Sequence, residues 1–176
     1  PVATTMEQMT VKEPYQPIYA FIYNLLLALL SPVLLLWLAY RVLVRGKSQE
    51  GLWERLGGVP SDVAEMCGSG SRVVWFHAAS VGEVAAAEPI IAAFLVREPT
   101  ARIVISTITP TGRRRAEQLR ARHEVGIIFF PFDVPFVVRR VFSALNPSAF
   151  VMVETELWPN VLAEAHRRDV KVAMVN

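Results

Sequence analysis

The chain has 176 residues, of which 53% are hydrophobic and 19% charged, and its formal net charge is +2. This length fits one domain with a sizeable core, while the high apolar fraction excludes a disordered chain and indicates a membrane element. A single cysteine excludes a disulfide framework, and three scattered histidines give no metal signature. The small net charge argues against a nucleic-acid partner.

The N-terminal part of the sequence contains a long apolar run. No charged residue lies between Glu13 and Arg41, and a helix of about 20 apolar residues spans the hydrocarbon core of a bilayer. Residues 18–44 are therefore predicted to form a membrane anchor behind an N-terminal tail of residues 1–17. Pro32 is expected to kink or split this helix, so a spanning helix and a helix lying in the interface both remain open, beside a buried core helix.

Basic residues that include Arg45 follow the apolar run, and the positive-inside rule then places the rest of the chain in the cytoplasm. Residues 45–71 are interpreted as a basic connector that becomes rich in glycine and serine. Within it, Trp53 and Leu56 flank Arg55, a pattern that suits a short helix on an anionic lipid surface. A plain linker turn explains the same residues equally well.

Residues 72–176 are predicted to form an α/β domain, because short and nearly continuous apolar runs alternate there with helical patterns. Such alternation favours a Rossmann-like parallel sheet with helices on both faces. Since the sequence stops straight after an apolar run, we expect it to be the N-terminal piece of a longer protein. The predicted strands are residues 73–78, 102–107, 126–130, 149–153 and 170–175, and the predicted helices are residues 83–96, 111–122, 134–145 and 159–168.

Parallel sheets of this type bind ligands outside the carboxyl ends of their strands, where the loops to the next helices gather. The loop after the first predicted strand contains Ser80, Gly82 and Glu83. Gly82 permits a tight turn, and Glu83 falls in the first turn of the next helix. A carboxylate there either complements the helix dipole or acts as a general base for a substrate hydroxyl.

The loop after the second predicted strand carries hydroxyl groups at a helix start. Thr109, Thr111 and Gly112 lie there, and Arg113 leads a run of three arginines. Hydroxyls and free backbone N–H groups at a helix start bind phosphate or sugar. The glycine–lysine–serine core of a P-loop is missing, and the arginines are also compatible with a solvated helix face.

The loop after the fourth predicted strand carries two acids, Glu154 and Glu156, before Trp158 and Pro159. Pro159 suits the first position of a helix. If the first and fourth strands are neighbours, Glu154 faces the same crevice as Glu83. Two carboxylates in one crevice can divide labour, because one removes a proton while the other orients a group or stabilises charge.

Taken together and in order, these motifs closely resemble the bacterial 3-deoxy-D-manno-octulosonic acid (Kdo) transferase family. The resemblance implies a two-domain GT-B fold, of which this chain holds the acceptor-side N-terminal half. It also implies an absent C-terminal nucleotide-binding domain, so the chain alone is expected to be inactive. The motifs that carry the resemblance are residues 80–83, 109–112, 131–133 and 154–160, with residues 45–47 and 54–57 of the connector.

The resemblance further implies an activity. Members of this family transfer Kdo from CMP-Kdo to the lipid A precursor, lipid IVA, at the cytoplasmic face of the bacterial inner membrane, without a metal or cofactor. The partners implied are these two substrates, an anionic membrane surface and the absent domain, and no nucleic acid. Two alternatives remain: a membrane-tethered α/β module that binds a ligand without chemistry, and a GT-B enzyme that uses another nucleotide sugar.

The resemblance also assigns roles to residues of the loops. Glu83 matches the catalytic base of an inverting transfer, and Glu154 matches a residue that stabilises the transition state. No residue is expected to bind a metal. The acceptor-binding candidates are the other loop residues, Ser80, Gly82, Thr109, Thr111, Gly112, Arg113 and Glu156.

Overall fold

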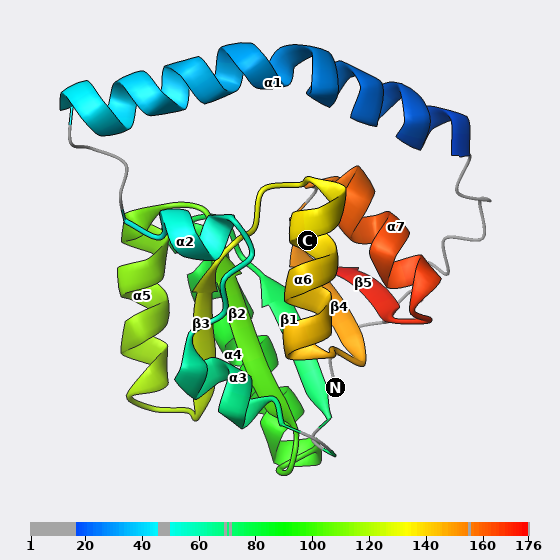
Figure 1. The fold of residues 1–176 in the computed structure, drawn as a ribbon. Helices are drawn as coiled ribbons and strands as arrows, with labels where there is room; N and C mark the ends of the chain where they lie inside the picture. Colours follow the sequence, from blue (N-terminus) through cyan, green and yellow to red (C-terminus); the bar gives the residue numbers. More distant parts are fainter. Residues whose placement is uncertain (1–16, 46–49, 69, 71, 155, 176) are drawn as a thin grey trace.

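The computed structural model describes residues 17–45, 50–68, 70, 72–154 and 156–175. Five strands form one parallel sheet in the order β3-β2-β1-β4-β5 (Figure 1). This arrangement confirms the predicted α/β class, and every strand begins and ends within one residue of the prediction. The strands are β1 (Val73–His77), β2 (Arg102–Thr107), β3 (Val125–Phe129), β4 (Ala149–Val153) and β5 (Lys171–Val175).

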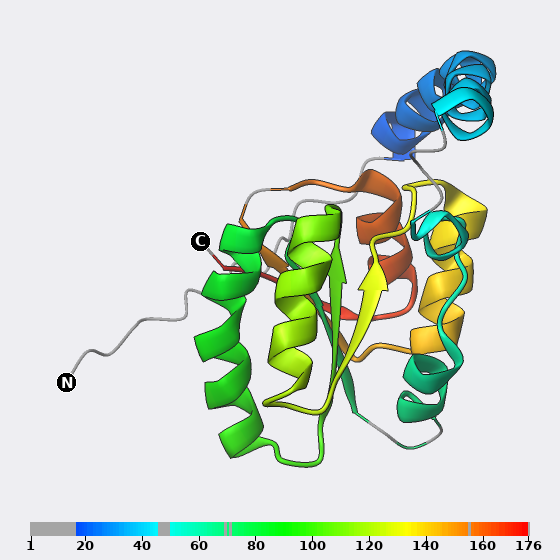
Figure 2. The same cartoon turned by 90° about the vertical axis from the view of Figure 1, so that its left-hand side faces the viewer.

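Helices connect these strands and cover both faces of the sheet, as Figure 2 shows. The connecting helices are α4 (Val81–Arg97), α5 (Pro110–Arg120), α6 (Pro135–Leu145) and α7 (Pro159–Arg167). α4 and α5 lie on one face, and α6 and α7 lie on the other. The last three begin with a proline, whose fixed φ and missing N–H suit the first helical position. The predicted Rossmann-like layering is therefore present.

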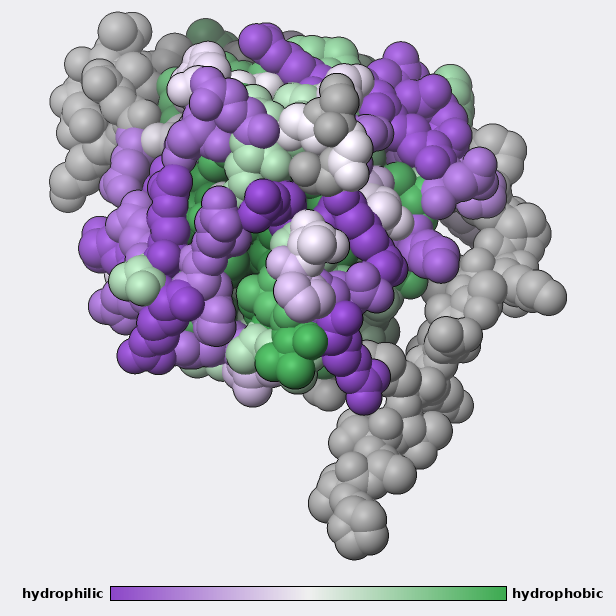
Figure 3. Space-filling model, turned by 90° about the horizontal axis from the view of Figure 1, so that it is seen from below, coloured by the Kyte–Doolittle hydropathy of each residue, from purple (hydrophilic) through white to green (hydrophobic). Residues whose placement is uncertain are grey.

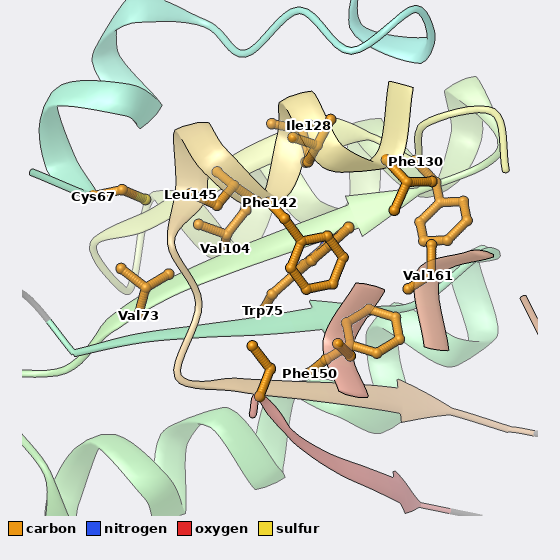
Figure 4. Packing of buried hydrophobic residues seen from close by; sticks show 14 of the residues in the cluster. Cys67, Val73, Trp75, Val104, Ile128, Phe130, Phe142, Leu145, Phe150 and Val161 are labelled. Atoms are coloured by element: carbon orange, nitrogen blue, oxygen red, sulfur yellow. The ribbon is translucent and has the colours of Figure 1, made fainter. Parts of the chain in front are cut away.

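β1 is the central strand and is buried on both faces. Its alternate side chains enter two hydrophobic clusters: Trp75 packs against α6 and α7, whereas Val74 and Phe76 pack against α4 and α5. Trp75 meets Phe142 and Phe150 edge to face, with ring centroids 5.3 and 4.8 Å apart (Figure 4). Such pairs contribute about 0.5–1.5 kcal/mol beyond their buried area. Burial on both faces explains why the strand appears in the sequence as a continuous apolar run.

α1 (Pro17–Arg45) is one continuous helix that lies across the carboxyl edge of the sheet (Figure 1). Pro32 lies inside it and does not split it. A proline has no N–H to donate to the carbonyl four residues earlier; here that carbonyl belongs to Ala28, and the Ser31 hydroxyl donates to it instead at 2.8 Å. Taken over the residues whose side chains the structure describes, no helix is long and apolar enough to cross a membrane.

Two short helices, α2 (Leu52–Arg55) and α3 (Ser61–Met66), occupy the segment expected to be a connector. Both pack against β3. Gly126 of β3 makes room for α3, because a Cβ there would lie 2.9 Å from Val63 and 2.8 Å from Met66. The described residues of the connector are therefore part of the domain.

Arg55, which the sequence suggested could contact lipid headgroups, has partners within the domain. Its guanidinium lies 4.6 Å from the centre of the Phe129 ring and donates to the carbonyl of Ile108. Burial lowers the pKa of Arg55 from its ordinary value, and the neighbouring carboxylate of Glu54 opposes this shift. Trp53 of the same helix remains exposed.

A nearly buried carboxylate holds α7 to α6. Glu164 is 5% exposed and accepts hydrogen bonds from Arg167 at 2.8 Å and from Arg168 at 2.6 Å. Arg168 also donates to the Ser143 hydroxyl on α6 at 2.8 Å. The hydrogen bond from Arg167 is the main cause that lowers the pKa of Glu164.

We expect Glu164→Gln to lower the free energy of unfolding at pH 7. The loss should fall near the low end of about 1.5–3 kcal/mol, the range for a hydrogen bond to a charged group, because the arginines are partly exposed. Since the pKa of Glu164 is lowered in the folded state, its contribution is present above the ordinary carboxyl pKa and is lost as the pH falls through the folded value. Urea unfolding at pH 7 and pH 3 measures this dependence.

Glu124→Gln is the matched control for this prediction. Glu124 pairs with Arg102 at 3.0 Å, but its side chain is 77% exposed. Its loss should therefore cost less than about 1 kcal/mol at either pH. An equally large destabilisation by Glu164→Gln at pH 3 and pH 7 would contradict the charge interaction assigned to Glu164.

Candidate active site

The topological switch point of the sheet lies between β1 and β4. From β1 the chain moves outward to β2 and β3 and then crosses to β4 on the other side of β1. β1 and β4 pair in parallel, with His77 opposite Met152 at their carboxyl ends, which confirms the pairing that the site prediction required. Loops that leave such a pair diverge and open a crevice, the usual ligand site of these sheets. Glu83 follows β1 and Glu154 follows β4, so both carboxylates flank this switch point.

The Glu83 side chain folds back toward the start of its own helix, α4. Ser80 is the N-cap of α4, and its hydroxyl accepts the Glu83 N–H at 3.4 Å. The Glu83 carboxylate accepts hydrogen bonds from the Ser80 hydroxyl and from the backbone N–H of Ala79, both at 2.7 Å. This arrangement is similar to a capping box, although the backbone N–H that Glu83 binds belongs to the residue before the N-cap. The carboxylate lies in the first turn of α4, where it complements the helix dipole, as the first of the two alternatives for Glu83 requires. Each carboxylate oxygen keeps a further lone pair for a ligand.

Gly82 lies in the exposed first turn of α4. A Cβ at this position would meet nothing nearer than the Ser80 hydroxyl oxygen at 3.9 Å, so packing within the chain does not require glycine. Glycine costs about 1 kcal/mol relative to alanine inside a helix. Its effect here is to leave the helix backbone uncovered at the edge of the crevice.

The loop after β2 is fastened to the loop after β1. The carbonyl of Ala79 accepts the N–H groups of Ile108 at 3.1 Å and Thr109 at 3.3 Å. Thr109 caps α5, because its hydroxyl accepts the Gly112 N–H at 3.0 Å, and the Thr111 hydroxyl donates to it at 3.2 Å. A Cβ on Gly112 would lie 2.9 Å from the Thr109 hydroxyl oxygen and 3.2 Å from the Ala79 carbonyl oxygen. Glycine is therefore required at this close approach.

Arg113 forms an ion pair with Glu54 of α2. Its guanidinium donates to both carboxylate oxygens of Glu54, at 2.8 and 2.7 Å, and lies 4.7 Å from the centre of the Phe129 ring. Glu54 also accepts the backbone N–H of Phe129 at 2.7 Å. The structure thus gives Arg113 a partner within the domain and not a solvated helix face, and its contact with the acceptor stays a prediction.

Glu154 is the first residue after β4. It is exposed and has a left-handed backbone with φ 69°, a conformation that costs a non-glycine residue free energy. Its N–H donates to the carbonyl of Val175 on β5 at 2.8 Å. In the part of the chain that the structure describes, its carboxylate forms no hydrogen bond or ion pair, with Glu83 or with any other residue.

Glu156 contacts the end of β1. Its Oε2 accepts hydrogen bonds from Nε2 of His77 at 2.9 Å and from the indole N–H of Trp158 at 3.3 Å. The hydrogen bond from His77 is the main cause that lowers the pKa of Glu156, against the opposing effect of burial. One oxygen of this acceptor-binding candidate is therefore already engaged within the protein.

His77 is a residue of this region that sequence reasoning did not single out. It ends β1, is fully buried and stacks on the Phe130 ring at a centroid distance of 3.8 Å. Its Nδ1 lies 3.1 Å from the hydroxyl oxygen of Ser106. The sequence signal was a histidine at the end of an otherwise apolar strand, directly before the loop that carries Glu83.

Asp133 is a second such residue, since the sequence placed it only within a motif. Its carboxylate accepts the backbone N–H groups of Asn160 and Val161, each at 3.0 Å. It thereby caps α7, whose own N-cap residue Trp158 makes no side-chain capping bond. Burial raises the pKa of Asp133 in spite of these bonds.

α1 is attached beside this cap. The side-chain amides of Asn24 and Asn160 exchange two hydrogen bonds, at 2.9 and 3.0 Å. The Tyr23 side chain also lies near the Asp133 carboxylate. α1 therefore meets the domain at the N-terminus of α7, on the same edge of the sheet as the crevice.

Carboxylates, hydroxyls and backbone amides surround one switch point of the sheet. Such groups bind the hydroxyls of a sugar, and a carboxylate can remove a proton from one of them. Among the described residues, no group of three or more His, Cys, Asp or Glu side chains is placed to hold a metal ion.

Comparison with known proteins identifies the family. The family model described as 3-deoxy-D-manno-octulosonic-acid transferase (kdotransferase) matches residues 50–176, from just before α2 onward. Curated transferases of that name from Chlamydophila psittaci and Haemophilus influenzae are 31% and 29% identical over 90% of this chain. A probable mitochondrial one from Arabidopsis thaliana is 32% identical over 89%. The chain spans 36%, 36% and 34% of these three relatives, about a third of their length. The chain belongs to the 3-deoxy-D-manno-octulosonic acid transferase family.

Proposed function

We propose that the protein to which this chain belongs transfers Kdo from CMP-Kdo to the lipid A precursor, lipid IVA. This chain supplies the acceptor-side half of a GT-B enzyme, and a further domain supplies the nucleotide site. The observation that carries the proposal is the position of Glu83, a carboxylate at the first turn of α4 beside the β1–β4 switch point. Membership of the family supports Kdo as the group transferred.

In the proposed reaction Glu83 is the general base. A hydroxyl of the acceptor sugar gives its proton to the Glu83 carboxylate, its oxygen bonds to the anomeric carbon of Kdo, and the bond from that carbon to CMP breaks. Attack opposite to the leaving group inverts the anomeric centre. The Ser80 hydroxyl and the Ala79 N–H hold the carboxylate in one orientation, which lowers the entropic cost of reaching the reactive geometry.

Glu154 stabilises the charge that develops on the Kdo ring in this scheme. It stands on the opposite side of the switch point from Glu83, and its exposed carboxylate is available to a ligand. Two carboxylates with different surroundings can hold different roles in one site. The proposed transfer uses no metal and no cofactor.

We expect Glu83→Gln in the full-length protein to lower the rate of Kdo transfer by about 10²–10⁴, the usual contribution of a general base. Glutamine keeps the shape of the side chain, and its carbonyl oxygen still accepts one of the two capping hydrogen bonds, so α4 should remain folded. Mass spectrometry of the lipid product measures the rate, and circular dichroism checks the fold.

Glu65→Gln is the control for this experiment, because Glu65 is exposed on α3. Glu88, the next carboxylate along α4, is unsuitable, since it bridges Arg115 at 2.6 Å and Arg122 at 2.7 Å. A folded Glu83→Gln protein with undiminished transfer would remove Glu83 from the chemistry. Faster transfer from another nucleotide sugar than from CMP-Kdo would favour the alternative donor.

We further propose that α1 anchors the protein to the cytoplasmic face of the bacterial inner membrane. Apolar side chains along α1 are exposed, among them Phe21, Leu29 and Val33, and Trp53 and Phe136 are exposed on the domain. The opposite edge of the sheet is different, because its surface is largely hydrophilic (Figure 3). This asymmetry supports a membrane on the side of α1.

Deletion of residues 1–44 should release much of the full-length protein from membranes and leave a salt-sensitive remainder. Because Arg55 is covered by the domain, the remaining attraction to anionic lipid rests on Arg45 and Lys47. Each basic residue near the surface contributes about 1 kcal/mol. Sedimentation with membrane vesicles at low and high salt measures the effect; equal sedimentation of the deletion variant at both would refute this electrostatic account.

A further inference from the structure

A buried imidazole ends β1, and the reaction scheme above gives it no role. His77 is 0% exposed, stacks on Phe130, and meets the edge of Trp158 at a centroid distance of 6.2 Å. A polar ring at the centre of a sheet costs free energy unless its nitrogens have hydrogen-bond partners. Both nitrogens of His77 have such partners, and one partner is a carboxylate of the candidate site.

The partners of His77 form a connected series of hydrogen bonds that ends at Glu156. The indole N–H of Trp75 donates to the Ser106 hydroxyl oxygen at 2.8 Å, and this oxygen lies 3.1 Å from Nδ1 of His77. Nε2 of His77 lies 2.9 Å from Oε2 of Glu156. An indole only donates and an ionised carboxylate only accepts. The Nε2 atom of His77 therefore carries the proton of the hydrogen bond to Glu156.

This series of hydrogen bonds ends at Glu156, two residues after Glu154. The N–H of Glu156 donates to the carbonyl of Glu154 at 3.1 Å, so the two residues are coupled through the backbone. Glu154 has its left-handed φ of 69°, and such backbone conformations persist only where the surroundings hold them. The bond from His77 to Glu156 crosses from the end of β1 to the loop after β4, below the crevice.

We propose that His77 is a positioning residue for the transfer: through Glu156, it holds the backbone that presents Glu154 at the crevice. The inference rests on the proposed function, because it takes Glu154 to be the group that stabilises charge. His77 itself is buried and does not touch substrate. Its effect should therefore appear in kcat rather than in the KM of the acceptor.

Two substitutions separate the hydrogen bond from the packing. His77→Phe keeps an aromatic ring against Phe130 but has no donor for Glu156. His77→Gln loses the ring but retains an N–H that can reach Glu156. In the full-length protein we expect His77→Phe to lower kcat by up to about 10²-fold, the cost of misplacing a catalytic group by about 1 Å, and His77→Gln to restore most of this loss. His123→Phe, at the opposite edge of the sheet, should leave transfer unchanged.

A double-mutant cycle tests whether His77 acts through Glu154. We expect His77→Phe to cause little further loss of kcat in a Glu154→Gln protein, since residues that act as a unit are not additive. Full additivity, unchanged kcat in folded His77→Phe, or unchanged kcat in Glu154→Gln would each overturn the inference. If His77→Phe does not fold, Glu156→Leu removes the same bond from the other end and must give the same result.

Amide hydrogen exchange tests whether the hydrogen bond between His77 and Glu156 holds the loop after β4, and it does so independently of activity. The backbone amides of Glu156 and Leu157 should exchange faster in His77→Phe than in the wild type, and His77→Gln should reverse most of the change. Equal exchange in all three proteins would overturn the inference even if transfer is normal. Absence of Kdo transfer in the wild type would instead refute the proposed function, so the two failures are distinguishable.

Discussion

The parallel pairing of β1 with β4 is the interaction on which the rest of the structure depends. With β2 on its other side, β1 is enclosed by neighbours in the sheet and by helices on both faces. Because the chain leaves β1 toward β2 and returns at β4, the loops after β1 and β4 diverge at this point. The same pairing brings His77 beside β4 and sets Glu83 and Glu154 in the two segments that leave the switch point.

Carboxylates at helix starts serve both the fold and the site. Glu83 caps α4 from within its own first turn, and Asp133 caps α7 from a distant loop. The Asp133 carboxylate satisfies two backbone N–H groups that α7 leaves unpaired at its start, and the Glu83 carboxylate accepts the N–H of Ala79 directly before α4. Each carboxylate complements the positive end of a helix dipole. The Asp133 cap is also the point where Tyr23 and Asn24 attach α1. A lipid held by α1 would therefore lie next to the crevice.

The sequence allowed the sheet to be predicted closely, because apolar strands and proline-started helices leave local signals. It also placed Glu83 in the first turn of the helix after β1 and Glu154 directly after β4, where the structure has them. It failed for side chains whose partners are distant in the chain: Arg113 binds Glu54, 59 residues away, and His77 binds Glu156, 79 residues away. Spacing alone cannot show such partners. It likewise could not show that Ser31 replaces the N–H that Pro32 lacks.

The central claim is that the acceptor reacts in the crevice between the loops after β1 and β4, with Glu83 as base. The most direct measurement is a structure of the full-length protein with lipid IVA and an unreactive analogue of the donor. The account predicts an acceptor hydroxyl within hydrogen-bond distance of the Glu83 carboxylate and directed at the anomeric carbon of the analogue. An acceptor bound with its hydroxyls away from Glu83, at the amino edge of the sheet or on α5, would contradict it.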